Sequence, residues 1–250
     1  MPASLALLFA AGLLAGAMNA AAGGGSFVSI PAMVAVDLPP LAANASSTVA
    51  LLPGTLASAW GWRREFRPIE GMRLATLIGI SLAGGLAGAG LLLATSERAF
   101  DALLPWLLLI GTVAFTFGRG IGEALRRHVR LGPGPVLAAQ IVLSVYAGYF
   151  GGGVGIMMMA VWSLLGTVDI RAMSAARTVL VSAANAVAVL CFALAGPVRW
   201  PETLALMAGA AAGGYGGAVL ARRIPPAWLR RFVILFSVAM TVLFFGRSYG

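Results

Sequence analysis

The chain has 250 residues, of which 60% are hydrophobic and 10% are charged, with a mean hydropathy of +0.94. A soluble domain is about 25% charged, so this composition excludes a soluble globular protein and predicts a polytopic membrane protein. The net charge of +9 comes from arginine alone, because the sequence has no lysine. The arginines gather between apolar segments, as in cytoplasmic loops beside anionic lipid, and therefore do not indicate a nucleic-acid partner.

The first apolar segment, Ser4–Ala22, is close in length to a bilayer-spanning helix. Small residues near its end resemble a signal-peptide cleavage site, but the basic n-region is missing, so we expect a retained first helix. Three glycines follow, Gly23–Gly25, and each disfavours a helix interior by about 1 kcal/mol relative to alanine. The next segment, Ser26–Val36, is too short to span and predicts a half-helix, which Asp37 and two prolines end.

The rest of the first half contains three apolar segments that we expect to span the membrane. They are Ala42–Trp62, with Trp60 and Trp62 as expected interfacial anchors, Leu74–Thr95 and Ala102–Gly118. A basic stretch then separates this half from a second one in which the glycine break recurs. The second half comprises Pro135–Phe150, the break at Gly151–Gly153, Val154–Thr167, Ala172–Gly196, Thr203–Ala221 and Phe232–Gly246. We therefore divide the chain into a first membrane repeat (1–118), a basic cytoplasmic linker (119–134) and a second membrane repeat (135–250).

Arginine counts orient the two halves, because basic segments remain in the cytoplasm. The segments Ser96–Asp101 and Pro197–Glu202 carry one arginine each. Four arginines each lie in Arg63–Arg73, Arg119–Gly134 and Arg222–Arg231. If all three strong segments are cytoplasmic, the halves have opposite orientations and both termini lie on the other side. The expected fold is an all-α polytopic integral membrane protein with two inverted-topology repeats, each with a glycine-broken re-entrant helix pair and three full spans.

The two glycine triplets are the strongest candidates for a binding site. Irregular backbone at membrane depth survives only inside protein or beside an aqueous cavity, so we expect both triplets near the midplane. Each opens a half-helix whose first N–H groups carry partial positive charge, which suits a small anion. The expected backbone contacts come from Gly23, Gly24, Gly25, Gly151, Gly152 and Gly153. Ser26 either adds a hydroxyl to the site or acts as a helix cap. The alternative to a binding site is that both triplets are simple tight turns between helices.

A polar patch follows each triplet where the next span begins. Aligning the patches pairs Asn44 with Ser174, Ser47 with Arg177, and Thr48 with Thr178, and we expect all six to face the substrate. Arg177 lies inside an apolar segment, where an arginine costs about 2.5 kcal/mol or more by insertion scales. It is expected to pair with the anion through a forked contact. The alternative is a snorkelling residue that pairs with Asp169 or with lipid headgroups.

Weaker candidates lie near the two breaks. Asn19 and Asn185 line the pathway or form bonds between helices, and Tyr149 lines it or packs as an aromatic. Asp37 and Asp169 are expected to be turn or cap residues. The single histidine and the single cysteine exclude a zinc site of ordinary ligand count and a disulfide framework. No catalytic residue, metal site or cofactor is expected, since the sequence has no phosphate-binding loop, nucleophile elbow or His-Glu-x-x-His motif.

The chain resembles the TauE/SafE sulfite exporter family at two spaced signatures, and the resemblance extends nearly end to end. The first is AGGGSFVSIPAMVAVDLPPLAANASSTVALLPG (Ala22–Gly54), followed by Trp60–Arg63; the second is YAGYFGGGVGIMMMAVWSLLGTVDIRAMSAARTVL (Tyr146–Leu180). The signatures contain, by position, Gly23–Ser26, Asn44, Thr48, Gly151–Gly153, Arg177 and Thr178. Family members often have His at the positions of Leu41 and Arg171, Lys at that of Arg177 and Asn at that of Ser174.

The resemblance implies a multi-pass permease of the bacterial inner membrane that moves small organosulfur or sulfur oxyanions, such as sulfite, sulfonates or sulfoacetate, generally outward. We therefore predict a secondary transporter that works by alternating access, and not an enzyme. A passive small-anion channel is the alternative, and an assembly subunit that carries nothing is a third hypothesis. The expected partners are the anion and the lipid bilayer; a coupling proton or ion and a homodimer remain open.

Overall fold

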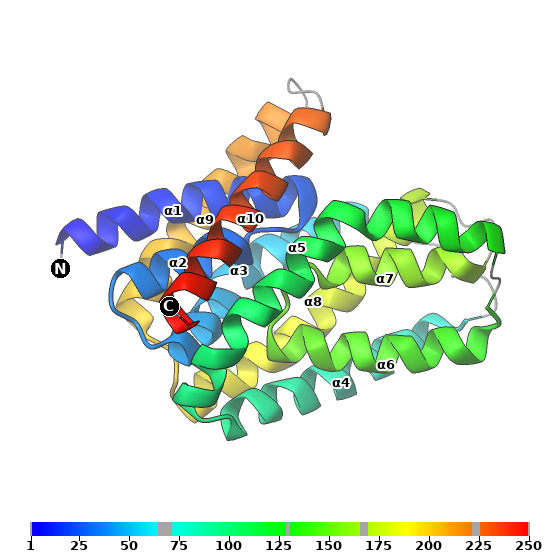
Figure 1. The fold of residues 1–250 in the computed structure, drawn as a ribbon, viewed down its shortest axis with the longest axis horizontal. Coiled ribbons are helices and arrows are strands. Elements are labelled where there is room, and N and C mark those ends of the chain that lie inside the picture. Colours follow the sequence, from blue (N-terminus) through cyan, green and yellow to red (C-terminus); the bar gives the residue numbers. More distant parts are fainter. Residues whose placement is uncertain (1, 65–71, 129–130, 166–169, 222–225, 250) are drawn as a thin grey trace.

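The computed structural model describes residues 2–64, 72–128, 131–165, 170–221 and 226–249, and these are almost entirely helical (Figure 1). The helices of the first half are α1 (Pro2–Ala22), α2 (Ser26–Ala35), α3 (Pro40–Gly61), α4 (Leu74–Ala94) and α5 (Glu97–His128). Those of the second half are α6 (Pro133–Tyr149), α7 (Val154–Trp162), α8 (Ile170–Ala195), α9 (Trp200–Ala221) and α10 (Pro226–Tyr249). Two 3-10 turns, η1 (Trp62–Arg64) and η2 (Ser163–Leu165), follow α3 and α7.

Within the described residues, four helical stretches are long and apolar enough to cross a membrane. They are Leu74–Ala94, Glu97–Gly118, Ala172–Ala195 and Arg231–Tyr249. Large apolar side chains remain exposed on these helices, including Phe117 of α5 and Leu194 of α8, as expected where a helix faces lipid rather than water. The prediction of an all-α membrane protein is confirmed.

Helix α5 is longer at both ends than the apolar segment Ala102–Gly118 predicts. It begins at Glu97, within the expected loop Ser96–Asp101, because Ser96 Oγ accepts a hydrogen bond of 3.3 Å from the N–H of Ala99 and caps the helix. It continues past Gly118 to His128, through most of the expected basic linker. Gly122 there packs against η2, since a side chain at this position would lie 3.0 Å from Ser163 Oγ. Close packing against η2 therefore explains the glycine at this position of α5.

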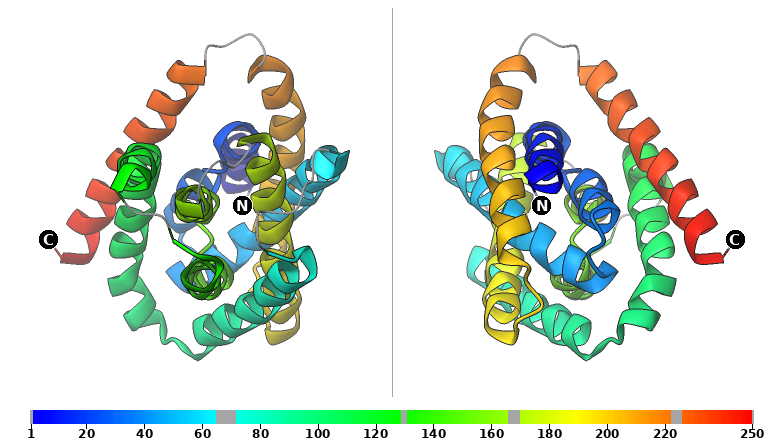
Figure 2. Two further views of the ribbon diagram at one scale, coloured as in Figure 1. Left: turned by 90° about the vertical axis from the view of Figure 1, so that its right-hand side faces the viewer. Right: turned by 90° about the vertical axis from the view of Figure 1, so that its left-hand side faces the viewer.

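The helices of the two halves pack reciprocally. Helix α1 lies along α9 and α6 lies along α4, while α3 packs on α8 and α5 on α10 (Figures 1 and 2). Glycines make the first two contacts close, because an ideal Cβ on Gly16 would lie 2.1 Å from the Ala210 oxygen and one on Gly88 would lie 2.1 Å from the Val145 oxygen. Small residues of this kind let two helix backbones approach within a membrane.

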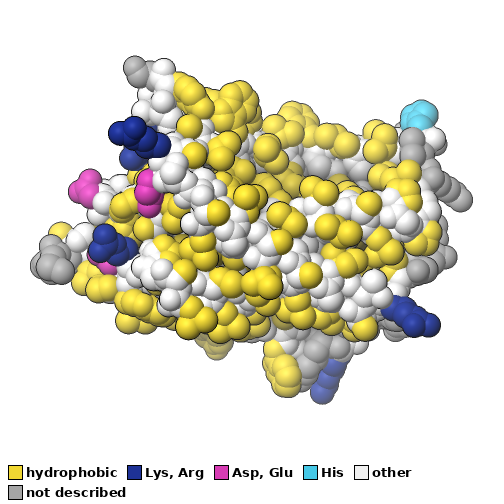
Figure 3. Space-filling view, turned by 90° about the horizontal axis from the view of Figure 1, so that it is seen from below, with side chains coloured by type: hydrophobic (Ala, Val, Ile, Leu, Met, Phe, Trp, Pro, Cys, Tyr) yellow, Lys and Arg dark blue, Asp and Glu magenta, His cyan; other side chains and the backbone are white. Residues whose placement is uncertain are grey.

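The chain has two distinct ends. Both termini lie at one end in Figure 1, which we call the terminal end. At the opposite end α3 and α5 finish, with the exposed arginines Arg64 and Arg73 nearby, and we call it the basic end. Figure 3 shows arginines at both ends, while the visible acidic side chains gather at the terminal end and the only histidine, His128, marks the basic end. The expected partner Asp169 and the arginines Arg67, Arg130, Arg222 and Arg223 lie outside the described residues.

Candidate functional site

Both predicted helix breaks occur where the sequence places them. Gly23 and Gly151 each adopt φ +77°, a left-handed conformation that favours glycine, and each interrupts the chain between a long helix and a half-helix. The first backbone bonds of the half-helices run from Phe27 N to Gly24 O (3.2 Å) and from Ile156 N to Gly153 O (3.1 Å). The N–H groups that come before Phe27 and Ile156 in the chain have no partner within the half-helix. They form the electropositive ends of α2 and α7.

We expect Gly23→Ala to lower the melting temperature of the purified protein. A side chain at this position meets nothing within 4 Å, so the cost is the left-handed backbone alone, about 1–2 kcal/mol. Gly54→Ala is the matched control, because Gly54 is exposed within α3, also meets nothing within 4 Å and has no positive φ. Asparagine tolerates this conformation better than alanine, so Gly23→Asn should fall between the parent and Gly23→Ala. Equal melting temperatures for both alanine variants would contradict the assigned break.

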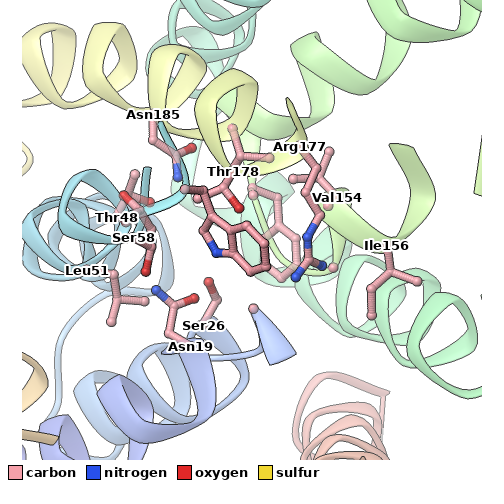
Figure 4. Close-up of a pocket in the computed structure, with 18 residues that line it drawn as sticks. Asn19, Ser26, Thr48, Leu51, Ser58, Val154, Ile156, Arg177, Thr178 and Asn185 are labelled. Carbon is pink, nitrogen blue, oxygen red and sulfur yellow. The ribbon is translucent and has the colours of Figure 1, made fainter. Parts of the chain in front are cut away.

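One cavity of about 100 Å³ lies where the two breaks meet α3 and α8 (Figure 4). It is large enough for several water molecules or a small anion. Of the predicted site residues, its walls contain Asn19, Gly23, Ser26, Thr48, Gly151, Gly153, Arg177, Thr178 and Asn185. The structure thus brings together residues from α1, both breaks, α3 and α8 around a single space.

The beginnings of both half-helices line this cavity. Gly23 and Ser26 contribute from the α2 side, whereas Gly153, Val154 and Gly155 contribute from the α7 side. The electropositive ends of α2 and α7 therefore border the same space, an arrangement that attracts an anion without a large number of charged side chains.

Arg177 is the one charged residue among the described residues that line the cavity. It is half-buried on α8 and lies along the first turn of α7, since an ideal Cβ on Gly155 would be 3.5 Å from Arg177 Cδ and 3.6 Å from its Nη1. Figure 4 shows its guanidinium reaching from α8 toward Val154 and Ile156 of α7. A guanidinium beside helix-end amides provides fixed donors for an oxyanion.

Hydroxyls and amides complete the lining. The Thr48 hydroxyl donates to the Asn44 carbonyl (2.9 Å) and the Thr178 hydroxyl donates to the Ser174 carbonyl (2.8 Å). With their hydrogens engaged, these threonines present mainly oxygen lone pairs to the cavity, so donors to an anion must come from Arg177, helix-end amides and other side chains. Asn185 Oδ1 is buried without a hydrogen-bond partner among the described residues.

The other predicted site residues lie outside the lining and pack in the protein. Asn44 Nδ2 donates to the Tyr149 carbonyl at 2.9 Å, and so links α3 to the second half. The Ser47 and Ser29 hydroxyls are bonded at 2.5 Å, which ties α3 to α2. The residues not lining the cavity are Gly24, Gly25, Asn44, Ser47, Tyr149, Gly152 and Ser174. The buried glycines among them have packing roles: an ideal Cβ on Gly25 would lie 2.7 Å from the Ala15 oxygen.

The cavity also contains residues that the sequence analysis did not select. A stripe on α3 continues from Thr48 through Leu51, Thr55 and Ser58 to Trp62 in η1. These positions recur every three or four residues, so they share one helix face, and this spacing was the available signal. Trp60 is 69% exposed, as an interfacial anchor would be, whereas Trp62 is half-buried in the cavity wall. The remaining lining residues are Phe150, Val154, Gly155, Ile156 and Val181.

A metal site has no support from side-chain clustering. Among the described residues, no three His, Cys, Asp or Glu side chains come together as a potential metal site. The described lining residues include no carboxylate, histidine or cysteine.

Comparisons with known proteins extend over almost the entire chain. Residues 8–244 match the family model described as Sulfite exporter TauE/SafE. A "Probable membrane transporter protein" of Haemophilus influenzae is 27% identical over 242 residues, covering 95% of this chain and 92% of the relative. The "Probable membrane transporter protein YfcA" of Escherichia coli K12 is 25% identical over 250 residues, covering 100% and 92%. "Probable membrane transporter protein ORF9" of a Sinorhizobium species is 26% identical over 239 residues, covering 95% and 91%. No solved structure matches the chain.

Proposed function

Because the chain belongs to the TauE/SafE sulfite exporter family, we propose that it is a secondary transporter that exports small sulfur-containing anions such as sulfite, sulfonates or sulfoacetate. It is a multi-pass membrane transporter of the bacterial inner membrane, as its relatives and its apolar helices show. The proposal concerns the substrate, its direction of movement and the mechanism, which is alternating access between two inverted repeats.

The observation that carries the proposal is the shared cavity at the two helix breaks. Two half-helix beginnings and Arg177 line a space of about 100 Å³ with no carboxylate among the described lining residues. Each helix end is equivalent to about +0.5 elementary charge, so two ends and one guanidinium amount to roughly +2. This favours a compact mono- or dianion over a cation or a neutral solute.

The lining also suits a substrate that has both oxygens and a small apolar part. Guanidinium and backbone N–H groups recognise oxyanion oxygens, whereas Leu51, Ile156 and Val181 offer apolar surface on the same walls. Sulfite uses only the polar groups, and a short sulfonate uses both. Groups fixed by the fold replace part of the hydration shell that the anion loses on entry.

We take the basic end to be cytoplasmic, because the positive-inside pattern of the sequence favours that orientation. Reciprocal packing of α1 on α9 and of α6 on α4 is what two equivalent repeats would produce, and this supports the inverted-repeat topology. Transporters built from such repeats bind substrate between them at broken helices and expose the site to one side at a time.

The alternative function is a passive small-anion channel. A specific observation favours the transporter, because α3 is tightly packed at the terminal end. All residues from Pro40 to Ser47 are buried, and the Arg199 N–H donates to Ser46 Oγ at 3.0 Å. A channel requires a continuous aqueous path, whereas a transporter is closed on at least one side.

We expect sulfur oxyanions to raise the melting temperature of the purified protein. Sulfite, methanesulfonate and sulfoacetate are compared as potassium salts with chloride at equal ionic strength. A ligand at 100 times its Kd stabilises the folded protein by about 2.7 kcal/mol, which gives a clear shift. Proteoliposomes then separate the two functions, since only a transporter saturates steeply and accumulates the anion against its gradient. If no sulfur oxyanion stabilises the protein beyond chloride, the proposed substrate class is wrong.

A further inference from the structure

We propose that the structure is the state of the transporter open toward the basic end, and that Phe192 is the gate residue that closes the terminal end, as the counterpart of Trp62. The inference rests on the proposed transport function and adds to it the state captured here and the residues that gate it. It rests on the difference between cavity residues of one half and the residues at the same places in the other half.

Some cavity residues come in matched pairs. The alignment that pairs Thr48 with Thr178 also pairs Leu51 with Val181 and Thr55 with Asn185 along α3 and α8. All six residues line the cavity. The matched glycines Gly23 and Gly151 do so as well. The centre of the cavity is therefore built equally by the two halves.

Other cavity residues have counterparts that are completely enclosed. Ser58 and Trp62 of the first half line the cavity, but their counterparts Ala188 and Phe192 are both 0% exposed. The same holds for Arg177, Gly155 and Ile156, all of which line the cavity. Arg177 corresponds to Ser47 (1% exposed) in the alignment of α3 with α8. Gly155 and Ile156 correspond to Phe27 (0%) and Val28 (4%) in the alignment that pairs Gly23 with Gly151, whose offset is two residues shorter. Asn19 of α1, whose counterpart Ala147 is 1% exposed, is an unmatched residue beside the first break. The five unmatched residues Ser58, Trp62, Arg177, Gly155 and Ile156 lie on one side of the centre.

That side is the basic end. Arg199, just beyond the end of α8, bonds to Ser46 near the start of α3, so the two helices run antiparallel. The last half of α3 and the first half of α8 therefore share the basic end. From Thr48 to Trp62 the cavity wall follows α3 for about 21 Å at 1.5 Å per residue, and it reaches η1, the last described element before α4.

The terminal end is sealed by the counterparts. Phe192 is fully buried on α8 in the apolar core that also contains Leu38, just before α3, and Leu41 in the first turn of α3. Phe27 packs edge-to-face on Phe115, with ring centroids 5.6 Å apart, and belongs to the same core. The bond from Asn44 Nδ2 to the Tyr149 carbonyl joins α3 to the end of α6 on this side.

Exchange of conformation between the halves gives the second state. Ala188 and Phe192 would then line an opening at the terminal end, while Ser58 and Trp62 would be enclosed. Each state buries one aromatic gate, Phe192 or Trp62, and exposes the other to the cavity. Removing the Phe192 ring weakens the seal of the present state alone, and so shifts the population toward the second state.

Thiol labelling at two matched positions tests this assignment. Cys191 is the only cysteine, so Cys191→Ala gives a cysteine-free background that receives Ser58→Cys or Ala188→Cys. A membrane-impermeant methanethiosulfonate with a quaternary ammonium group is applied from either side of oriented membrane vesicles. We expect the Ser58→Cys variant to react from the basic-end side and the Ala188→Cys variant to be protected from both sides. Equal labelling rates for the two variants would overturn the assigned state. This includes the case in which both react readily, as they would in an open pore.

Adding Phe192→Ala tests the gate itself. We expect about a tenfold faster reaction of the Ala188→Cys variant from the terminal-end side, with slower reaction of the Ser58→Cys variant. The matched control is Leu194→Ala, because Leu194 lies on the same helix but is 87% exposed; it should change neither rate. Unchanged rates with Phe192→Ala would overturn the gate. If this variant does not fold, Phe192→Leu is used in its place and is judged by the same two rates.

The labelling requires no anion, so the two hypotheses fail separately. If the labelling is as expected but sulfur oxyanions do not stabilise the protein, the gate assignment stands and the proposed substrate class is wrong. If those anions stabilise the protein but the two positions are labelled equally, the gate assignment is wrong and the proposed substrate class stands.

Discussion

Arg177→Ala is expected to abolish measurable stabilisation of the protein by sulfite and sulfonates while leaving the fold intact. Arg177 is the one charged residue in the described cavity wall, on α8 against the first turn of α7. A hydrogen bond to a charged group contributes about 1.5–3 kcal/mol, and its loss corresponds to a Kd roughly ten to one hundred and fifty times higher. The measurement is an anion titration of the melting temperature, together with the melting temperature of the anion-free protein.

Two comparisons separate a binding role from a general effect of charge. Arg199→Ala removes the same charge from an exposed residue at the terminal end, where the described hydrogen bonds of Arg199 are made by its backbone N–H and carbonyl. It should bind anions as the parent does. Arg177→Lys keeps the charge but loses the planar fork, so it should bind more weakly than the parent and more strongly than Arg177→Ala. If Arg177→Ala binds sulfite and sulfonates as well as the parent, the cation has no role in binding.

The breaks in the helices were predictable from sequence because glycine acts locally. A triplet such as Gly23–Gly25 disfavours a helix whatever surrounds it, and the structure has the break there, with Gly23 and Gly151 at the same positive φ. The class of fold was equally accessible, because composition and the lengths of apolar segments determine it. These features depend on neighbouring residues and not on how distant helices pack.

The partners of polar side chains within the spans were not predictable in the same way. Asn44 and Thr48 belong to one polar patch, yet Asn44 bonds to Tyr149 in the other half and Thr48 lines the cavity. Hydropathy is alike for a polar residue that bonds across a helix interface and one that faces a cavity. Which of the two occurs depends on the rotation of α3 against α8, and a single sequence contains no direct signal for that rotation.

Trp62 shows a related limit. A tryptophan at the end of a span is typical of an interfacial anchor, and that description suits Trp60, which is 69% exposed. Trp62 is two residues further along the chain and therefore points from a different face of the helix, and it lies in the cavity wall instead. The spacing of Thr48, Leu51, Thr55, Ser58 and Trp62 contains this information, but it becomes decisive only when Thr48 is known to face the cavity.

The largest expected loss of stability comes from Gly88→Leu in α4. An ideal Cβ on Gly88 would lie 2.1 Å from the Val145 oxygen and 2.7 Å from the Tyr149 nitrogen, both backbone atoms of α6. Backbone cannot move aside as a flexible side chain does, so α4 and α6 must separate. Overpacking typically costs 1–3 kcal/mol, and we expect about 3 kcal/mol or more here because the neighbour is a helix backbone. The measurement is the melting temperature in detergent.

Gly90→Leu is the matched control, because Gly90 lies in the same helix and a side chain there meets nothing within 4 Å. Leucine has a higher helix propensity than glycine by about 0.5–1 kcal/mol, and this gain applies equally at both positions. The control should therefore keep or raise the melting temperature, whereas Gly88→Leu should lower it. A loss at Gly88 also reaches the proposed anion site, since Tyr149 ends α6 directly before the second glycine break. Similar melting temperatures for both variants would show that α4 and α6 do not depend on the close approach that Gly88 permits.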